Sequence, residues 1–317
     1  MKVPFVDLRA QYLSIKDEID LAVRAVIEET AFVRGKYVEA FEKAFAQAYG
    51  VKHCIGVANG TDAIYVTLKM LGIGAGDEVI TVANSWISTS ETITLTGARP
   101  VFVDIEKDFY NIDAGQIEKQ ITTRTKAILP VHLYGQSADI SAIKGICEKH
   151  GLLLVEDCAQ AHFAEYRRKR VGTFGIAGTF SFYPGKNLGA YGDAGCVITD
   201  DDKLAERIRM YANHGSLKKH EHDMEGVNSR LDGLQAAILS VKLKYINDWN
   251  AARHRNAMEY NKLLAGVEGL IVPQTRPEAS HIFHVYCVRA RKRDELAAHL
   301  KDGGVETGIH YPTALPF

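Results

Sequence analysis

The sequence predicts an α/β protein with a mostly parallel, seven-stranded sheet flanked by helices. Over about the first 200 residues, short apolar runs alternate with longer segments of helical periodicity. These runs lack the hydrophobic–polar alternation of a half-exposed strand, so helices should cover both faces of the sheet. The expected strands are residues 54–58, 78–82, 101–103, 126–131, 152–156, 179–182 and 195–199.

Helical patterns separate these strands and then dominate the C-terminal third. We expect helices at residues 62–71, 88–96, 139–149 and 293–300. A longer helical stretch begins near Leu231, continues past Trp249 and breaks or bends before Gly266. A β-like run is expected at residues 283–288, and residues 305–310 are expected to belong to the same C-terminal part. We therefore predict a large domain, residues 1–245, and a smaller C-terminal α+β domain, residues 246–317.

The composition excludes several classes of protein. The chain has 317 residues and a formal net charge of −1, which argues against a general nucleic-acid or membrane-surface role. No apolar run approaches the ~20 residues of a membrane span, and the first residues lack the apolar core of a signal peptide. None of the five cysteines belongs to a Cys-x-x-Cys pair. We interpret them as buried, reduced thiols of a cytoplasmic protein rather than disulfides or zinc ligands.

A loop of small residues, Asn59-Gly60-Thr61, follows the first expected strand. Gly60 lets a ligand approach the backbone closely, and Thr61 can cap the helix that follows. The N-terminal N–H groups of that helix would suit a phosphate. An ordinary capped helix start explains the same residues, so both interpretations stay open for this motif alone.

Asp157 ends a hydrophobic strand and is followed by Cys158-Ala159-Gln160. Ligands of open α/β sheets lie at such strand ends, and a carboxylate buried there without a partner is costly. One partner is a helix N-terminus. Another is a protonated heteroaromatic nitrogen, because an aspartate beside a pyridinium keeps the ring cationic and able to accept electrons. Gln160 could then reach a hydroxyl of the same ring.

Lys186 lies in a loop of small residues after another strand, five positions beyond Ser181. A lysine can form a Schiff base with an aldehyde, and a serine hydroxyl can hold a phosphate. Most lysines are solvated surface charges, so this spacing alone says little. Taken together, a phosphate site (Gly60, Thr61, Ser181), a ring-nitrogen partner (Asp157) and this lysine match the groups of pyridoxal 5′-phosphate.

Four motifs together resemble the DegT/DnrJ/EryC1/StrS family of sugar aminotransferases, which are pyridoxal-phosphate enzymes of fold type I. The resemblance runs from Pro4 to Pro312. The motifs are residues 58–63, 156–162, 181–189 and 226–232. The family usually continues beyond the position of Phe317, so we expect either a truncated sequence, with an incomplete smaller domain, or a short member of the family.

The resemblance implies a role for each cofactor-site residue. Lys186 binds the cofactor aldehyde and later moves the proton, while Asp157 pairs with the pyridine nitrogen and Gln160 faces the ring hydroxyl. The residues that it assigns to the phosphate are Gly60, Thr61 and Ser181. No metal is expected.

Two further residues are assigned by the alignment of motifs alone. Trp86 falls where the family stacks an aromatic ring on the cofactor, although a core aromatic would fit the sequence equally well. Asn228 falls where the family reaches a phosphate across a dimer interface, although it could be a turn residue. The expected unit is therefore a homodimer with shared active sites. The expected substrate-binding residues are Tyr183, His162, Arg230, His310 and Tyr311.

The residues around Lys186 also bear on the substrate. Family members that act at C3 of a dTDP-linked 3-keto-6-deoxysugar tend to read Tyr-Pro-Gly-Lys-Asn-Leu-Gly-Ala, as residues 183–190 do here. Those that act at C4 more often have His in place of Tyr183. The resemblance therefore implies a ping-pong transfer of an amino group from glutamate to C3, giving dTDP-3-amino-3,6-dideoxyhexose.

The sequence departs from the family pattern at two positions. Phe163 and Ile176 stand where the family usually has Gly and Asp, and we expect Phe163 to alter the pocket wall.

A C4 aminotransferase and a pyridoxal-phosphate sugar dehydratase are alternatives, but the dehydratases carry His in place of Lys186. A non-catalytic regulatory dimer that binds a cofactor or sugar nucleotide belongs to a different class. A cofactor-free lysine enzyme would leave Asp157 and Gln160 without a shared purpose.

Overall fold

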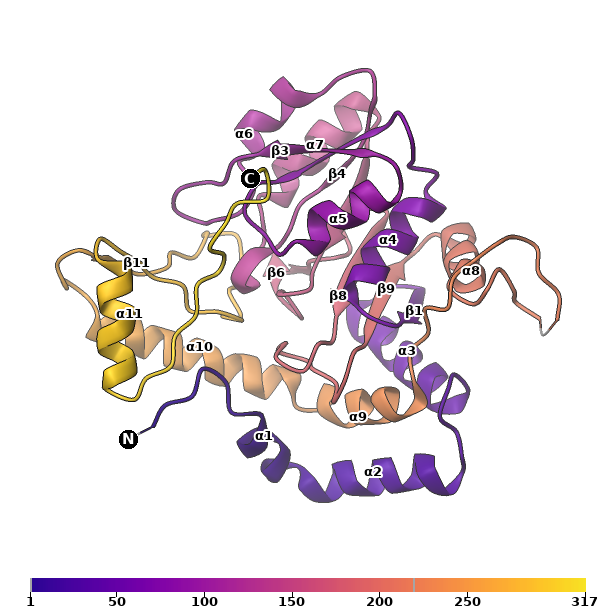
Figure 1. Ribbon diagram of the computed structural model, residues 1–317, viewed down its shortest axis with the longest axis horizontal. Helices are drawn as coiled ribbons and strands as arrows, with labels where there is room; N and C mark the ends of the chain where they lie inside the picture. The colour runs from indigo at the N-terminus through magenta and orange to yellow at the C-terminus, as the bar shows by residue number, and fades with distance from the viewer. Residues whose placement is uncertain (1, 219) are drawn as a thin grey trace.

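The computed structural model describes residues 2–218 and 220–317 and confirms the seven-stranded, mostly parallel sheet (Figure 1). The strand order is β1-β9-β8-β5-β4-β2-β3, and β9 runs antiparallel to both of its neighbours. The strands are β1 (His53–Val57), β2 (Glu78–Val82), β3 (Arg99–Val103), β4 (Thr125–Leu129), β5 (Leu153–Asp157), β8 (Ala177–Ser181) and β9 (Gly195–Thr199). Every expected strand is present, with small differences at the ends.

Helices cover both faces of the sheet, as strands that are apolar on both sides require. On β4, Ile128 packs in one core cluster with Ile143 of α7 (Ile140–His150). Leu129 points the other way and packs with Leu68 of α4 (Gly60–Met70) and Ile93 of α5 (Ser88–Leu95). The helices of the two layers are α3 (Lys36–Tyr49), α4 (Gly60–Met70), α5 (Ser88–Leu95), α6 (Ala114–Ile117), α7 (Ile140–His150), α8 (Asp202–Tyr211) and α9 (Gly233–Leu243).

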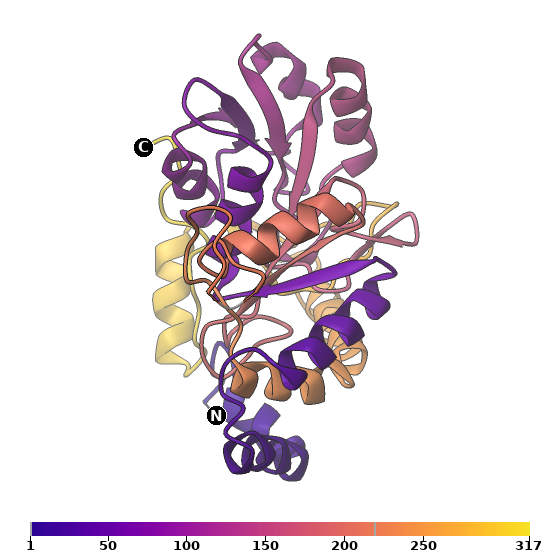
Figure 2. The same cartoon turned by 90° about the vertical axis from the view of Figure 1, so that its right-hand side faces the viewer.

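Smaller elements complete the fold. Helices α1 (Leu8–Ser14) and α2 (Lys16–Glu28) lie at one end of the molecule, where α2 packs against α9 (Figure 2). The C-terminal part contains α10 (Ile246–Leu263) and α11 (Arg293–Asp302). The short elements are β6 (Glu165–Tyr166), β7 (Lys169–Arg170), β10 (Leu270–Ile271), β11 (Arg289–Ala290) and the 3-10 turns Glu118–Gln120 and Leu133–Gly135.

The expected long helical stretch is present and bends before Gly266, as expected: a turn at Lys244–Tyr245, where the N–H of Tyr245 bonds to the carbonyl of Lys242, divides it into two helices, and the second ends at Leu263. One expectation for the C-terminal part is wrong. Residues 283–288 do not form a strand. Phe283 has a left-handed backbone (φ 47°) that bends the chain and stacks its ring on His281, 3.9 Å between centroids. β11 begins only at Arg289.

The C-terminal segment returns to the sheet after α11. Val305 forms a single parallel bridge to Val3. Further on, the N–H of Leu315 donates to the carbonyl of Ala83 at 2.8 Å, directly after β2. Figure 1 shows this segment in yellow, running from α11 toward α5. The boundary between two domains at residue 245 stays a prediction.

Four of the five cysteines are buried, as expected, whereas Cys287 is partly exposed, and all five are free in the structure. Within the described residues, no helix combines the length and apolar character that a bilayer span needs.

Phe163 has a left-handed backbone (φ 66°), a conformation that normally favours glycine. Its ring is 8% exposed and packs on Tyr49 of α3, 4.8 Å between centroids, with the guanidinium of Arg170 4.6 Å from its centre. The hydroxyl of Tyr49 accepts its backbone N–H at 2.8 Å. The expectation that Phe163 alters the pocket wall is therefore wrong, because its side chain belongs to the core under α3.

Replacing Phe163 should separate backbone strain from packing. Phe163→Ala should lower the free energy of unfolding by about 3–5 kcal/mol, because the ring is lost and the strain stays. Phe163→Gly loses the same ring but relieves the left-handed backbone, so it should be about 1 kcal/mol more stable than the alanine variant. Urea denaturation of the three proteins measures both differences. An alanine variant at least as stable as the glycine variant would contradict this account.

Candidate active site

The predicted phosphate-binding residues meet where α4 begins beside the end of β8. A Cβ atom built on Gly60 would lie 2.4 Å from the Cβ of Ser181, so only glycine fits there. This close approach sets the first N–H groups of an 11-residue helix beside the Ser181 hydroxyl. A phosphate would fit the donors that this arrangement presents.

The cap of α4 differs from expectation. Asn59, not Thr61, caps the helix: its side-chain oxygen accepts the N–H of Asp62 at 2.8 Å. The Thr61 hydroxyl instead lies 2.7 Å from the hydroxyl of Ser88, the first residue of α5. The prediction that Thr61 is the cap is therefore wrong, but its hydroxyl still lies in the first turn of α4.

Asp157 is a buried carboxylate with few partners. It is 5% exposed at the end of β5, and one oxygen accepts the N–H of Ala159 at 3.0 Å. The other oxygen receives only a long 3.4 Å contact from the hydroxyl of Thr89. Burial raises the pKa of Asp157, while the Ala159 hydrogen bond and the charge of Lys186 oppose that rise. The carboxylate therefore retains acceptor capacity for a cationic N–H group, such as a protonated ring nitrogen.

Lys186 lies within electrostatic reach of Asp157. Its side chain is partly buried, and burial lowers its pKa, while the charge of Asp157 acts in the opposite direction. A lowered pKa increases the fraction of neutral amine, which is the form that attacks an aldehyde. The structure thus brings together the two residues on which the cofactor prediction depends.

Gln160 connects the cofactor site to the C-terminal segment. Its side-chain oxygen accepts the N–H of Tyr134 at 2.7 Å, and its amide donates to the hydroxyl of Tyr311 at 2.8 Å. Tyr311 also lies against Trp86, 5.9 Å between ring centroids. Trp86 is 59% exposed, so it is not a core aromatic. The ring of Trp86 is available to stack on a ligand.

The other predicted substrate residues of this region differ in their surroundings. Tyr183 is 59% exposed beside Lys186. His310 is half-buried and stacks on Phe5, 5.6 Å between ring centroids, while its carbonyl accepts the hydroxyl of Tyr134. Both remain candidates for substrate contact.

His162 does not line the site. Its side chain is fully buried against the rings of Phe180 and Phe182, 5.6 Å from each. Burial lowers the pKa of His162 to about 3, so its ring is neutral. The prediction that His162 contacts the substrate is therefore wrong for this arrangement of the chain, because its ring has no exposed surface.

Asn228 and Arg230 flank Ser229, whose hydroxyl accepts the N–H of Ala58 at 3.2 Å and donates to the carboxylate of Asp62 on α4 at 2.7 Å. Asn228 is exposed and its backbone pairs with Asn213. Arg230 lines a separate cavity of about 60 Å³ together with Arg209 and other residues of α3 and β1. Ser229 thus links this segment to the start of α4, where the predicted phosphate site lies.

Sequence reasoning missed Thr89, whose hydroxyl contacts both the Ser85 hydroxyl and the Asp157 carboxylate. It is 2.9 Å from the hydroxyl of Ser85 and 3.4 Å from the carboxylate of Asp157. The one available signal was the hydroxyl-rich run that begins the helix after Trp86. Nothing local shows that this helix starts beside the end of β5.

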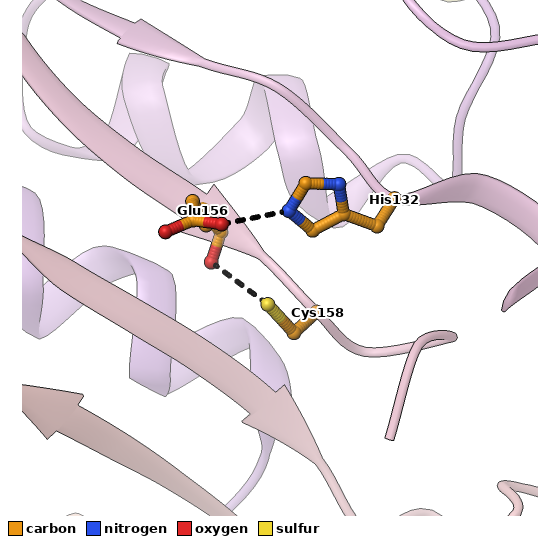
Figure 3. A group of neighbouring side chains, drawn as sticks. All are labelled: His132, Glu156 and Cys158. Carbon is orange, nitrogen blue, oxygen red and sulfur yellow. Dashed lines mark hydrogen bonds and ion pairs between the residues drawn. The ribbon is translucent and has the colours of Figure 1, made fainter. Parts of the chain in front are cut away.

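Glu156, which precedes Asp157 on β5, forms a buried cluster with His132 and Cys158 (Figure 3). One potential ligand atom of each side chain lies within 4.8 Å of those of the other two. The Glu156 carboxylate accepts the Nε2–H of His132 at 2.9 Å. Its other donors are the N–H groups of Gly172, Phe174 and Gly175, at 2.7, 2.7 and 2.9 Å.

The donor set of this cluster does not suit a metal ion. His132 Nδ1 accepts the N–H of Ala138 at 3.1 Å, so both ring nitrogens are engaged. Burial raises the pKa of Cys158, which keeps its thiol protonated. We interpret the cluster as a hydrogen-bond centre that fixes β5 and the 172–175 loop.

Known proteins resemble this chain over almost its whole length. The profile of the DegT/DnrJ/EryC1/StrS aminotransferase family matches residues 13–316. A dTDP-3-amino-3,6-dideoxy-alpha-D-galactopyranose transaminase from Aneurinibacillus thermoaerophilus is 46% identical over 98% of this chain and 85% of its own. A UDP-2-acetamido-2-deoxy-3-oxo-D-glucuronate aminotransferase from Pseudomonas aeruginosa is 43% identical over 99% of this chain and 87% of its own.

Solved structures agree with these relatives. DesV from S. venezuelae, in complex with a ketimine intermediate, superposes with a TM-score of 0.97 at 44% identity, covering 99% of this chain and 85% of that one. NtdA from Bacillus subtilis, with bound cofactor PMP, has a TM-score of 0.91 at 32% identity, covering 99% and 73%. The chain therefore belongs to the DegT/DnrJ/EryC1/StrS aminotransferase family, pyridoxal-phosphate enzymes of fold type I.

Proposed function

We propose that this enzyme transfers an amino group from glutamate to C3 of a dTDP-linked 3-keto-6-deoxyhexose, giving dTDP-3-amino-3,6-dideoxyhexose. The observation that carries the proposal is that Lys186 lies in the loop after β8, the strand paired with β5, at whose end the under-partnered carboxylate of Asp157 is buried. Pyridoxal phosphate supplies the aldehyde and the electron-accepting ring when bound. This pair of residues is what such a cofactor needs from the protein.

Each residue then has a physical task. Asp157 holds a proton on the ring nitrogen, since its desolvated carboxylate favours a cationic partner. Lys186 moves a proton between carbon atoms, a role for which its lowered pKa suits it. Gly60, Thr61 and Ser181 hold the phosphate at the start of α4, Trp86 stacks on the ring, and Gln160 orients the ring hydroxyl.

The names of the relatives support amino transfer at C3 of the sugar, but they differ in the nucleotide that carries the sugar. One relative carries "3-amino" in its name and the other "3-oxo", so both names point to position 3 of the sugar. One is a dTDP sugar enzyme and the other a UDP sugar enzyme. The choice of a dTDP-linked deoxysugar follows the Tyr183-Pro184-Gly185-Lys186 sequence, with Tyr183 exposed beside the lysine.

A panel of nucleotide sugars tests the proposal. With glutamate as donor, turnover should be highest with a dTDP-3-keto-6-deoxyhexose, measured by mass spectrometry of the amino sugar and by release of 2-oxoglutarate. Lys186→Ala should abolish turnover and still bind the cofactor, because the phosphate site at Gly60 and Ser181 is unchanged. Turnover of 4-keto sugars alone would refute C3 transfer. No turnover of any keto sugar would favour the regulatory alternative.

We further propose that the enzyme acts as a homodimer with shared active sites. The support is that Asn228, Trp86 and Tyr183 are all exposed in the single chain. The two N-terminal helices also present exposed apolar side chains such as Leu21 and Ile27. A second copy that covers these surfaces could bring Asn228 to the phosphate. The free thiols agree with a cytoplasmic setting.

Complementation between two inactive variants tests the shared site. In a dimer of one Lys186→Ala chain and one Asn228→Ala chain, one site would combine an intact Lys186 with the intact Asn228 of the other chain. Mixing the two proteins after reversible unfolding should therefore give about a quarter of wild-type activity. Each variant refolded alone is the control. A mixture no more active than the average of these controls would show that the two residues do not act across chains.

A further inference from the structure

Helix α9 holds the chain segment that follows Lys186. Lys242, on α9, is fully buried, and its ammonium donates to the carbonyl of Gly189 at 2.6 Å. Gln235, on the same helix, accepts the backbone N–H of Tyr191 at 2.8 Å. Two side chains of one helix thus bind the backbone three and five positions after Lys186.

Lys242 receives little compensation for its burial. Besides the Gly189 carbonyl, its ammonium lies 4.2 Å from the centre of the Tyr191 ring. Burial lowers the pKa of Lys242 to about 8, and no charged group in the described residues offsets this shift appreciably. The amine is therefore still protonated at neutral pH, although a buried ammonium with one acceptor is an unfavourable arrangement. An apolar side chain of similar length could replace it without loss of stability.

The short turn between Lys186 and Gly189 could let the Lys242–Gly189 hydrogen bond influence the position of Lys186. The N–H of Lys186 donates to the carbonyl of Tyr183 at 2.8 Å. A Cβ atom on Gly189 would lie 2.3 Å from the carbonyl oxygen of Pro184, so the backbone packs closely there and only glycine fits. The pKa of Lys186 responds to burial and to Asp157, not to the charge of Lys242. Any influence of Lys242 on Lys186 therefore passes through the backbone.

We propose that Lys242 is a positioning residue: by holding the Gly189 carbonyl, it fixes the turn that presents Lys186 to the cofactor. The proposal rests on the proposed role of Lys186. It explains why a buried ammonium faces this turn, although it adds little to the stability of the fold.

Lys242→Met tests the proposal, with Lys244→Met as the matched control. Lys244 lies just beyond the end of α9, is exposed and pairs with Glu18, so its loss removes a charge without touching Gly189. In the cofactor-free protein, Lys242→Met should have an unfolding midpoint in urea equal to or above that of wild type. Amide hydrogen exchange of residues 183–192 should become about tenfold faster, while α3 exchanges unchanged. In the loaded protein, the absorption band of the bound cofactor should titrate at a shifted pH.

The outcomes separate the possibilities. A Lys242→Met protein that fails to fold, or loses stability throughout, would show a structural role and overturn the proposal. Unchanged exchange of residues 183–192 would overturn it as well. If the exchange increases but wild-type protein never forms a cofactor band that depends on Lys186, the tether stands while the proposed function fails. Lys244→Met should match wild type in exchange and absorption.

Discussion

The burial of the Asp157 carboxylate at the end of β5 is the constraint on which the site depends. Because helices cover both faces of the sheet, this strand end is desolvated, and the carboxylate has one good donor and one long contact. Such a group favours a cation beside it. Its charge already influences Lys186, and a protonated ring nitrogen would satisfy its remaining acceptor capacity. The chemistry of the site therefore follows from an interaction that the protein alone leaves incomplete.

Glu156, the residue before Asp157, has a carboxylate whose hydrogen-bonding capacity is filled within the protein. Glu156 precedes Asp157 on the same strand, so its side chain points to the other face of the sheet. There it accepts four hydrogen bonds, from His132 and from the 172–175 loop. Two adjacent carboxylates are thus divided by the period of the strand. One is saturated and holds the sheet in place, while the other is left open toward the ligand side.

The sequence predicted what is local and missed what depends on distant contacts. Continuous apolar runs were sufficient to find all seven strands, and Asp157 and Ser181 could be placed because they end two of those strands. Thr89 and Lys242 could not be found, because their importance comes from helices that pack beside the site. His162 stands in a site motif, yet its ring turns into the core between two phenylalanines.

The unfolding free energy of Asp157→Asn, measured without cofactor, tests the central claim most directly. Because burial raises the pKa of Asp157 above its unfolded value, its ionised form destabilises the fold at neutral pH. The asparagine variant should therefore be more stable than wild type at pH 7, by about 1–3 kcal/mol. This advantage should shrink as the pH falls through the folded pKa and vanish below the unfolded value of about 3.9. A variant that is less stable than wild type at neutral pH would contradict the account, because Asp157 would then already have its partner.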